Sequence, residues 1–253
     1  MIRRDDAGAV AVLTLDHGKA NALDLELFHA LDRVLDEVAA SDAVRGVVLT
    51  GAGSMFSAGV DLFRVLEGGV AYLGEFVPHF PRVLRKLFLL PKPVVAAING
   101  HAIAGGCVLS SACDHAVAAD LELRIGVTEL LVGVPFPATA FEVFHHRVGG
   151  PQARRLILSG ETLGPHAARE RGLVDEVVPA DELLQHATAV AGQLGNLPAK
   201  AFAVTKQQLR QRAIDQVEGS LATCEEEVLR LWMAPETHAR IRAFLERTVG
   251  KKG

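Results

Sequence analysis

The sequence has few cysteines, no long hydrophobic run and no excess of positive charge. Its 253 residues include three cysteines, Cys107, Cys113 and Cys224, and these lack the paired spacing of a metal or redox motif. We interpret them as reduced, buried thiols of a cytoplasmic protein. The longest apolar stretch, "VVAAINGHAIAGG", is interrupted by asparagine and glycine, which argues against a membrane-spanning helix.

The formal net charge of −4 favours neither nucleic acid nor an anionic membrane surface as a partner. The first residues, "MIRRDDAGAV", lead at once into a strand-like pattern, so we expect no signal or transit peptide. The ten histidines are scattered, and the adjacent His145 and His146 do not have the spacing of zinc ligands. We therefore expect no nucleic acid, no membrane and no metal ion as a partner.

The composition, 49% hydrophobic and 22% charged residues, is that of a chain that can bury a large core. In the first two thirds, short apolar strand patterns alternate with helical ones, whereas the pattern after Asp181 is helical. This order predicts an α/β core over residues 1–195 and a helical C-terminal region over residues 196–253. The expected strands are residues 10–16, 46–51, 91–100, 115–119, 122–126 and 172–179. The expected helices include residues 24–40, capped by Asp24, and residues 70–90, interrupted by Pro78 and Pro81.

Two glycine-bearing loops are the first candidates for a site. "FSAGVDL" (residues 56–62) and "HAIAGGCVL" (residues 101–109) each follow a buried strand and place small residues before an expected helix. The start of a helix offers unpaired N–H groups, and small residues let a ligand approach them. Two such N–H groups aimed at one point would form an oxyanion hole. Tight packing between strand and helix explains the same glycines equally well.

Other catalytic patterns are missing, and one carboxylate stands out. No dinucleotide fingerprint, phosphate-binding loop or Gly-x-Ser-x-Gly motif occurs, and Ser110 and Ser111 are expected as core or cap residues. Glu129 is the one carboxylate in the apolar stretch "IGVTELLVGVPFP" (residues 125–137). Burial would raise its pKa toward neutrality, which suits a general base. A helix cap or a salt bridge is the alternative role for this glutamate.

The ordered set of motifs resembles the crotonase superfamily, also called the enoyl-CoA hydratase/isomerase family. The motifs are "NAL" (21–23), "FSAGVDL" (56–62), "PKPVVAAINGHAIAGG" (91–106), "CD" (113–114) and "GLVDEVV" (172–178). The resemblance implies a spiral of repeated ββα units, with a helical C-terminal region that assembles trimers or dimers of trimers. It also implies an acyl-CoA thioester as substrate, so that coenzyme A is part of the substrate and no separate cofactor is expected.

The same resemblance implies roles for individual residues. The N–H groups of Ala58 and Gly105 would stabilise the thioester oxygen, and Glu129 would be the acid/base. Asp61 is better interpreted as a structural cap of its loop than as a catalyst. The expected substrate-binding residues are Asn21, Ala22, Leu23, Asp61, Leu62, Gly106, Val108, Pro135 and Phe136.

The sequence departs from the hydratases of this family at one catalytic position. Hydratases use two glutamates to hold and activate water, and the first of them corresponds here to Val108, which we expect to be an apolar wall. A single glutamate is similar to the mitochondrial-type Δ3,Δ2-enoyl-CoA isomerases. The sequence thus predicts an isomerase that moves a double bond from position 3 to position 2 through a dienolate. The alternatives are a hydratase of fatty-acid β-oxidation that uses Glu129 alone, and a non-catalytic acyl-CoA-binding protein.

Overall fold

The computed structural model describes residues 1–249, except for the side chains of residues 220–224 and 249. Cys107 and Cys113 are buried and unpaired, as predicted, whereas the side chain of Cys224 lies outside the described residues. Two sheets of different size organise the fold. The larger sheet has the order β1 (Ile2–Ala7), β2 (Val10–Leu15), β3 (Gly46–Gly51), β5 (Val94–Ile98), β7 (His115–Ala119), β9 (Glu176–Val178). The smaller sheet has the order β4 (Met55–Ser57), β6 (His101–Ile103), β8 (Ile125–Gly126).

The chain passes three times from the larger sheet to the smaller sheet and then into a helix. Each unit pairs one strand of each sheet with the helix that follows: β3–β4–α2 (Leu62–Phe88), β5–β6–α3 (Gly105–Ser111) and β7–β8–α4 (Glu129–Val132). The strands β4, β6 and β8 are parallel, so their carboxyl ends lie at one edge of the small sheet. The starts of α2, α3 and α4 therefore meet at that edge, where ligands of parallel sheets usually bind.

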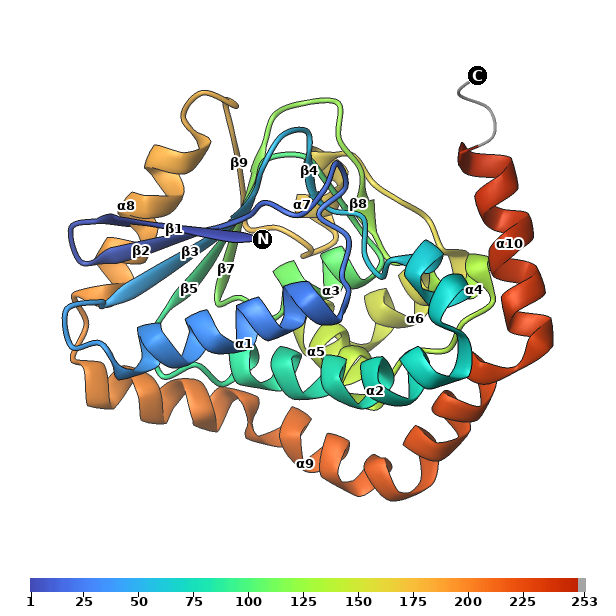
Figure 1. The fold of residues 1–253 in the computed structure, drawn as a ribbon. Coiled ribbons are helices and arrows are strands. Elements are labelled where there is room, and N and C mark those ends of the chain that lie inside the picture. The colour runs from blue at the N-terminus through green and yellow to red at the C-terminus, as the bar shows by residue number, and fades with distance from the viewer. Residues whose placement is uncertain (250–253) are drawn as a thin grey trace.

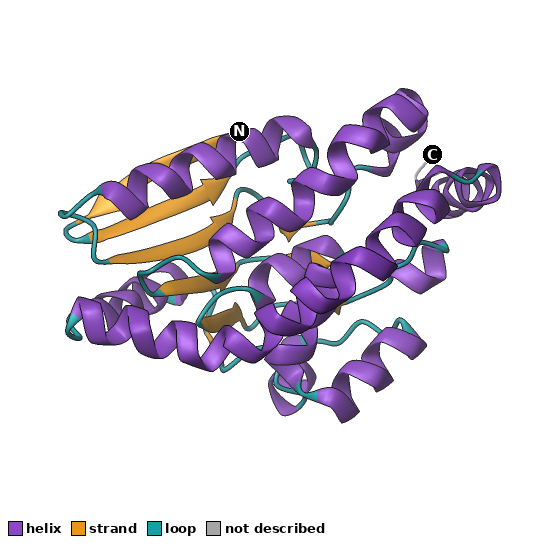
Figure 2. Cartoon of the chain, turned by 90° about the horizontal axis from the view of Figure 1, so that it is seen from below, coloured by secondary structure: helices purple, strands orange, loops and turns teal. Residues whose placement is uncertain are grey.

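The remaining helices cover the sheets and extend the chain around them (Figure 1). Helix α8 packs across the larger sheet, α9 runs below α1 and α2, and α10 lies beside α4. Figure 2 shows from below that the strands gather toward one side, while helices make up the rest of the molecule. The bounds are α1 (Leu25–Ala40), α5 (Ala138–Val148), α6 (Gly150–Ser159), α7 (Pro165–Glu170), α8 (Leu183–Gly195), α9 (Ala199–Met233) and α10 (Pro235–Val249).

Helix α1 forms where its sequence predicts it. The Asp24 side chain accepts a hydrogen bond of 2.8 Å from the N–H of Leu27, which satisfies one of the free donors at the helix start. The apolar residues that recur at helical spacing are buried, Phe28 among them, and its ring lies 5.2 Å from that of Phe80 in α2. Stacked aromatic rings thus join the two helices.

Helix α2 corrects one expectation. The predicted interruption at Pro78 and Pro81 does not occur, because the helix continues through both prolines. The break in helical geometry lies instead at Gly69, whose φ is 55°. Helices in proteins depend more on packing of their apolar face than on intrinsic propensity. The buried face of α2, with Phe76 and Phe80, outweighs the cost of two prolines.

A buried ion cluster attaches the helical C-terminal region to the core. The carboxylate of Asp114 lies 2.7 Å from Lys206 Nζ and 2.8 Å from a nitrogen of Arg210, both on α9. It also accepts a 2.8 Å hydrogen bond from the N–H of Val94 at the start of β5. Burial outweighs the attraction of Asp114 and lowers the pKa of Lys206 to about 8. The "CD" motif therefore has a structural role at this junction.

Candidate active site

The three helix starts surround one cavity of about 90 Å³. Its lining includes Ala58 after β4, Gly105 after β6 and Glu129 after β8, so three distant segments of the chain meet there. Leu62 and Pro135, which the sequence also singled out, line the same cavity. The edge of the small sheet thus brings together the residues that could carry chemistry.

Glu129 is the first residue of α4, and it is the only ionisable side chain among the described residues that line the cavity. Its Oε2 atom is buried and has no hydrogen-bond partner among the described residues. Burial raises the pKa of Glu129 to about 7, although the N–H groups of Glu129 and Thr128 oppose the rise. A carboxylate with a pKa near neutrality, facing a cavity, has the properties of a general base.

Two backbone N–H groups at the cavity have no acceptor among the described residues. One belongs to Gly105, the first residue of α3, where no intrahelical acceptor exists. The other belongs to Val60, since Leu23 pairs with the residues on either side of it: the Leu23 N–H donates to Gly59 O and the Asp61 N–H donates to Leu23 O. A methyl group placed on Gly105 would lie 3.7 Å from the Val60 nitrogen, so the two donors are neighbours.

The predicted role of Ala58 is corrected by this pairing. The Ala58 N–H already donates to the carbonyl oxygen of Ala20 at 3.0 Å, so it is not available to a ligand. Val60, two residues further on, has the free N–H group that an oxyanion hole requires. Sequence reasoning missed Val60 because the direction of its N–H follows from its pairing with a distant segment, and no local motif records that pairing.

The two adjacent glycines have different reasons to lack a side chain. A Cβ on Gly106 would lie 2.3 Å from the carbonyl oxygen of Ser57, so packing between β4 and α3 alone excludes a larger residue. A Cβ on Gly105 would lie 2.9 Å from the end of the Leu23 side chain, which can move. Ala104, just before them, has a φ of 50°, an uncommon conformation for a residue other than glycine. Packing therefore explains the lack of a side chain at Gly106, whereas the approach of a ligand explains it at Gly105.

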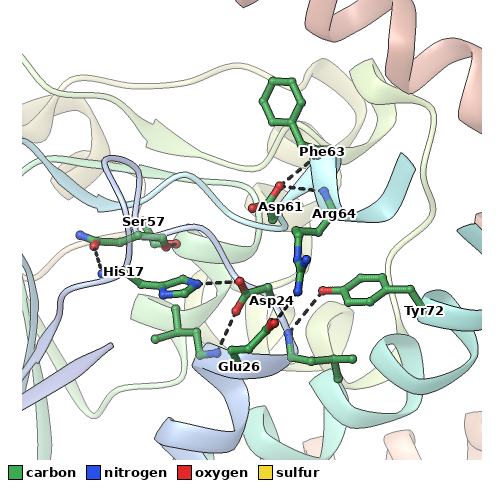
Figure 3. A network of polar contacts seen from close by, with 11 residues as sticks. His17, Asp24, Glu26, Ser57, Asp61, Phe63, Arg64 and Tyr72 are labelled. Carbon is green, nitrogen blue, oxygen red and sulfur yellow. Dashed lines mark hydrogen bonds and ion pairs between the residues drawn. The ribbon is translucent and has the colours of Figure 1, made fainter. Parts of the chain in front are cut away.

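A network of polar contacts supports the segment that pairs with Val60 (Figure 3). His17 Nε2 lies 2.6 Å from the Asp24 carboxylate. The backbone N–H of His17 donates a 3.0 Å hydrogen bond to Oδ1 of Asn21. Asp61 caps α2, as predicted, by accepting hydrogen bonds of 3.0 Å from the N–H groups of Phe63 and Arg64. These contacts hold the start of α2 and the segment before α1 in place on either side of the oxyanion donors.

Several other predicted substrate-binding residues lie outside the cavity lining. Asn21, Leu23 and Val108 are fully buried, so their side chains present no surface to a ligand. Gly106 is buried too. Asn21 instead donates hydrogen bonds to the carbonyl oxygens of Ala52 and Met55. Val108 was expected to be an apolar wall of the site, but it is a buried member of the hydrophobic core and does not line the cavity. The remaining predicted residues outside this lining are Ala22, Asp61 and Phe136.

Three aromatic residues of the site escaped sequence reasoning. Phe80 of α2, Trp232 of α9 and Phe244 of α10 line the cavity together with the loop after Glu129. Trp232 Nε1 donates a 3.2 Å hydrogen bond to the carbonyl oxygen of Pro135 and so ties α9 to that loop. No signal in the sequence pointed to these residues, because helices packed from three distant segments bring them together.

Comparison with known families identifies the context of this geometry. The model of the family described as enoyl-CoA hydratase/isomerase matches residues 5–250. The chain belongs to this family. The match confirms the resemblance seen in the motifs, and the family consists of enzymes, so the protein is an enzyme of the enoyl-CoA hydratase/isomerase family.

Relatives in this family include proteins named for either activity. A putative enoyl-CoA hydratase of Thermus thermophilus is 37% identical over 209 residues, 81% of each chain. The 2,3-dehydroadipyl-CoA hydratase of Escherichia coli is 33% identical and covers 96% of this chain and 95% of its own. The crystal structure of human mitochondrial Δ3-Δ2-enoyl-CoA isomerase has a TM-score of 0.94 at 25% identity, covering 100% of this chain and 99% of that chain. These names alone leave both reactions open within the family.

The described residues contain neither a membrane-spanning helix nor a cluster of metal ligands. No helix among residues 1–249 has both the length and the apolar character needed to cross a membrane. Among the described side chains, which exclude those of residues 220–224 and 249, no cluster of three or more histidine, cysteine or acidic side chains could bind a metal ion.

Proposed function

We propose that the protein is an enoyl-CoA isomerase that moves a double bond from position 3 to position 2 of an acyl-CoA thioester. The observation that carries this proposal is the single ionisable group at the cavity, Glu129, opposite two free N–H groups. One base is enough to move a proton between two carbons of the same substrate. The 25%-identical human neighbour, named Δ3-Δ2-enoyl-CoA isomerase, supports the same reading.

The proposed reaction begins with ionised Glu129, which removes a proton from C2 of the 3-enoyl thioester. The electron pair of that C–H bond moves toward the carbonyl, and the resulting dienolate oxygen accepts hydrogen bonds from the N–H groups of Val60 and Gly105. The protonated Glu129 then gives the proton to C4, and the double bond forms between C2 and C3. Such preorganised donors typically contribute about 10²–10³ in rate each.

The surroundings of Glu129 favour proton transfer over the addition of water. The walls near it are apolar, with Val132, Val134 and Pro135 on the segment that follows. A dry site strengthens the interaction of the dienolate with its donors and limits side reactions with water. A hydratase needs a second group to hold and activate water, and Val108, at the position where the family's hydratases have a glutamate, is buried in the core.

Hydration remains the second candidate function, because two relatives that are 37% and 33% identical carry hydratase names. The non-catalytic alternative is opposed by the buried Oε2 atom of Glu129, which has no hydrogen-bond partner among the described residues. We further propose a homotrimer or a dimer of trimers in the cytoplasm, with residues 196–253 as its helical assembly region. A solution mass of three or six times 26.9 kDa would agree with this assembly.

A paired assay tests the proposed reaction. Purified protein is given trans-3-hexenoyl-CoA or trans-2-hexenoyl-CoA, and the absorbance of the conjugated thioester is followed. An isomerase produces absorbance from the first substrate and removes little of it from the second. Rapid loss from the 2-enoyl substrate, with no gain from the 3-enoyl substrate, would establish hydration instead.

A further inference from the structure

Three aromatic side chains form part of the cavity wall, which we call the aromatic wall. Phe80, Trp232 and Phe244 lie on three different helices, and each lines the cavity on which Glu129 also borders. The donors Val60 and Gly105 fix the position of the thioester carbonyl, so the acyl chain has to extend within the space that these rings leave.

The space inside the cavity is small in comparison with an acyl chain of medium length. The cavity has a volume of about 90 Å³, whereas a protein cavity of about 150 Å³ accommodates one benzene molecule. By proportion, the space holds about four carbon-sized groups. An acyl group of about four carbons therefore fits without rearrangement, one of six carbons requires a small displacement of the lining, and a longer one requires a wall residue to move.

The three wall residues differ in how firmly they are held. Phe80 is buried and stacks on Phe28 at a centroid distance of 5.2 Å. Trp232 is buried and its indole N–H is bonded to the Pro135 carbonyl oxygen. Phe244 is only partly buried, on α10, which packs against α2, α4 and α9. Phe244 is thus the wall residue whose removal would extend the cavity with the least damage to the core.

We propose that the enzyme selects short acyl chains of about four to six carbons, and that Phe244 on the terminal helix sets this limit. The proposal rests on the proposed function, since it assigns the substrate length at the same site. An apolar pocket without such a wall would bind each further methylene about fourfold more tightly. Once the acyl chain reaches the aromatic wall, each further methylene weakens binding instead of strengthening it.

The test compares trans-3-hexenoyl-CoA with trans-3-decenoyl-CoA. We expect kcat/KM to fall by about 10- to 200-fold from the six-carbon to the ten-carbon substrate, the range of discrimination that excess methylenes produce in a fitted apolar pocket. Equal or better turnover of the ten-carbon substrate would overturn the length limit and leave the isomerase assignment intact.

Variants of neighbouring residues test the assignment to Phe244. Phe244→Ala should reduce the preference for the shorter substrate by about tenfold or more, and Phe244→Leu should give a smaller reduction in the same direction. The control is Leu245→Ala, because Leu245 is also partly buried on α10 but does not line the cavity. An unchanged preference in folded Phe244→Leu, or an equal change in Leu245→Ala, would refute the role of Phe244.

A binding measurement separates this proposal from the proposed function. Saturated hexanoyl-CoA and decanoyl-CoA cannot isomerise, so their dissociation constants report on the pocket whatever reaction the enzyme performs. Weaker binding of decanoyl-CoA supports the limit even if no 3-enoyl substrate is converted. Tighter binding of decanoyl-CoA contradicts it even if isomerisation is observed.

Discussion

The two ends of the cavity are built in different ways. At the reactive end, Val60, Gly105 and Glu129 each lie within a few residues of a strand of the small parallel sheet. At the closed end, Phe80, Trp232 and Phe244 come from helices that share no motif and meet only through packing. The proposed chemistry thus depends on local strand-to-helix turns, whereas the proposed limit on substrate length depends on how the helical C-terminal region docks.

The largest expected effect comes from a substitution of Glu129, which alters the reactive end alone. Glu129→Gln keeps the shape of the side chain but removes the base, so isomerase kcat should fall by about 10²–10⁴-fold. The exposed Glu122→Gln, the same change on a nearby segment, is the control and should leave kcat unchanged. Isomerase activity that survives Glu129→Gln, measured with trans-3-hexenoyl-CoA, would contradict the single-base mechanism.

The next largest effect concerns the buried ion cluster that attaches α9, which carries Trp232, to the core. Asp114→Asn leaves Lys206 and Arg210 buried without their counter-charge, which typically costs about 3–5 kcal/mol of unfolding free energy. Asp215→Asn, on the exposed side of α9, should change stability by less than about 0.5 kcal/mol. Urea denaturation of both variants checks this difference, and equal stabilities would show that the buried cluster does not anchor α9.

A third prediction concerns the pH dependence that Glu129 adds to stability. Burial raises its pKa from the ordinary value of 4.5 to about 7 in the folded protein, so the folded state binds more protons than the unfolded state between these values. The contribution of protonated Glu129 to stability is therefore fully present below about pH 4.5 and is lost as pH rises through about 7, by about 3 kcal/mol in total. Glu129→Gln lacks this loss, so its stability relative to wild type should increase from pH 4.5 to pH 8. A difference independent of pH would show that Glu129 is not desolvated.

The smallest expected effect is a difference in unfolding free energy between alanine variants of the two adjacent glycines of the reactive end. Gly106→Ala places a methyl group against the Ser57 carbonyl, so it should lower the unfolding free energy by about 1–3 kcal/mol. Gly105→Ala meets only the mobile end of Leu23 and should cost less. Thermal unfolding of the two variants ranks them, and the reverse order would mean that β4 and α3 can separate without penalty.

Sequence patterns correctly predicted those features that depend on a single segment of the chain. The alternation of buried strands and helices predicted β2, β3 and β5, and Asp24 and Asp61 cap the helices for which they were proposed. The predicted break of α2 at its prolines was wrong, because aromatic packing across that helix is a property of the folded molecule. Strands β4 and β6 escaped detection, since three residues are too few to show a period.

The sequence by itself determined the type of fold, the family and the position of a carboxylate in an apolar stretch, because hydrophobic periodicity and ordered motifs are local. The tertiary structure decided which N–H groups are free. Pairing of Leu23 with Val60 turns the Val60 N–H toward the cavity, while Ala20 occupies that of Ala58. It also decided that Phe80, Trp232 and Phe244 share one wall, since contacts between distant helices depend on how the whole chain packs.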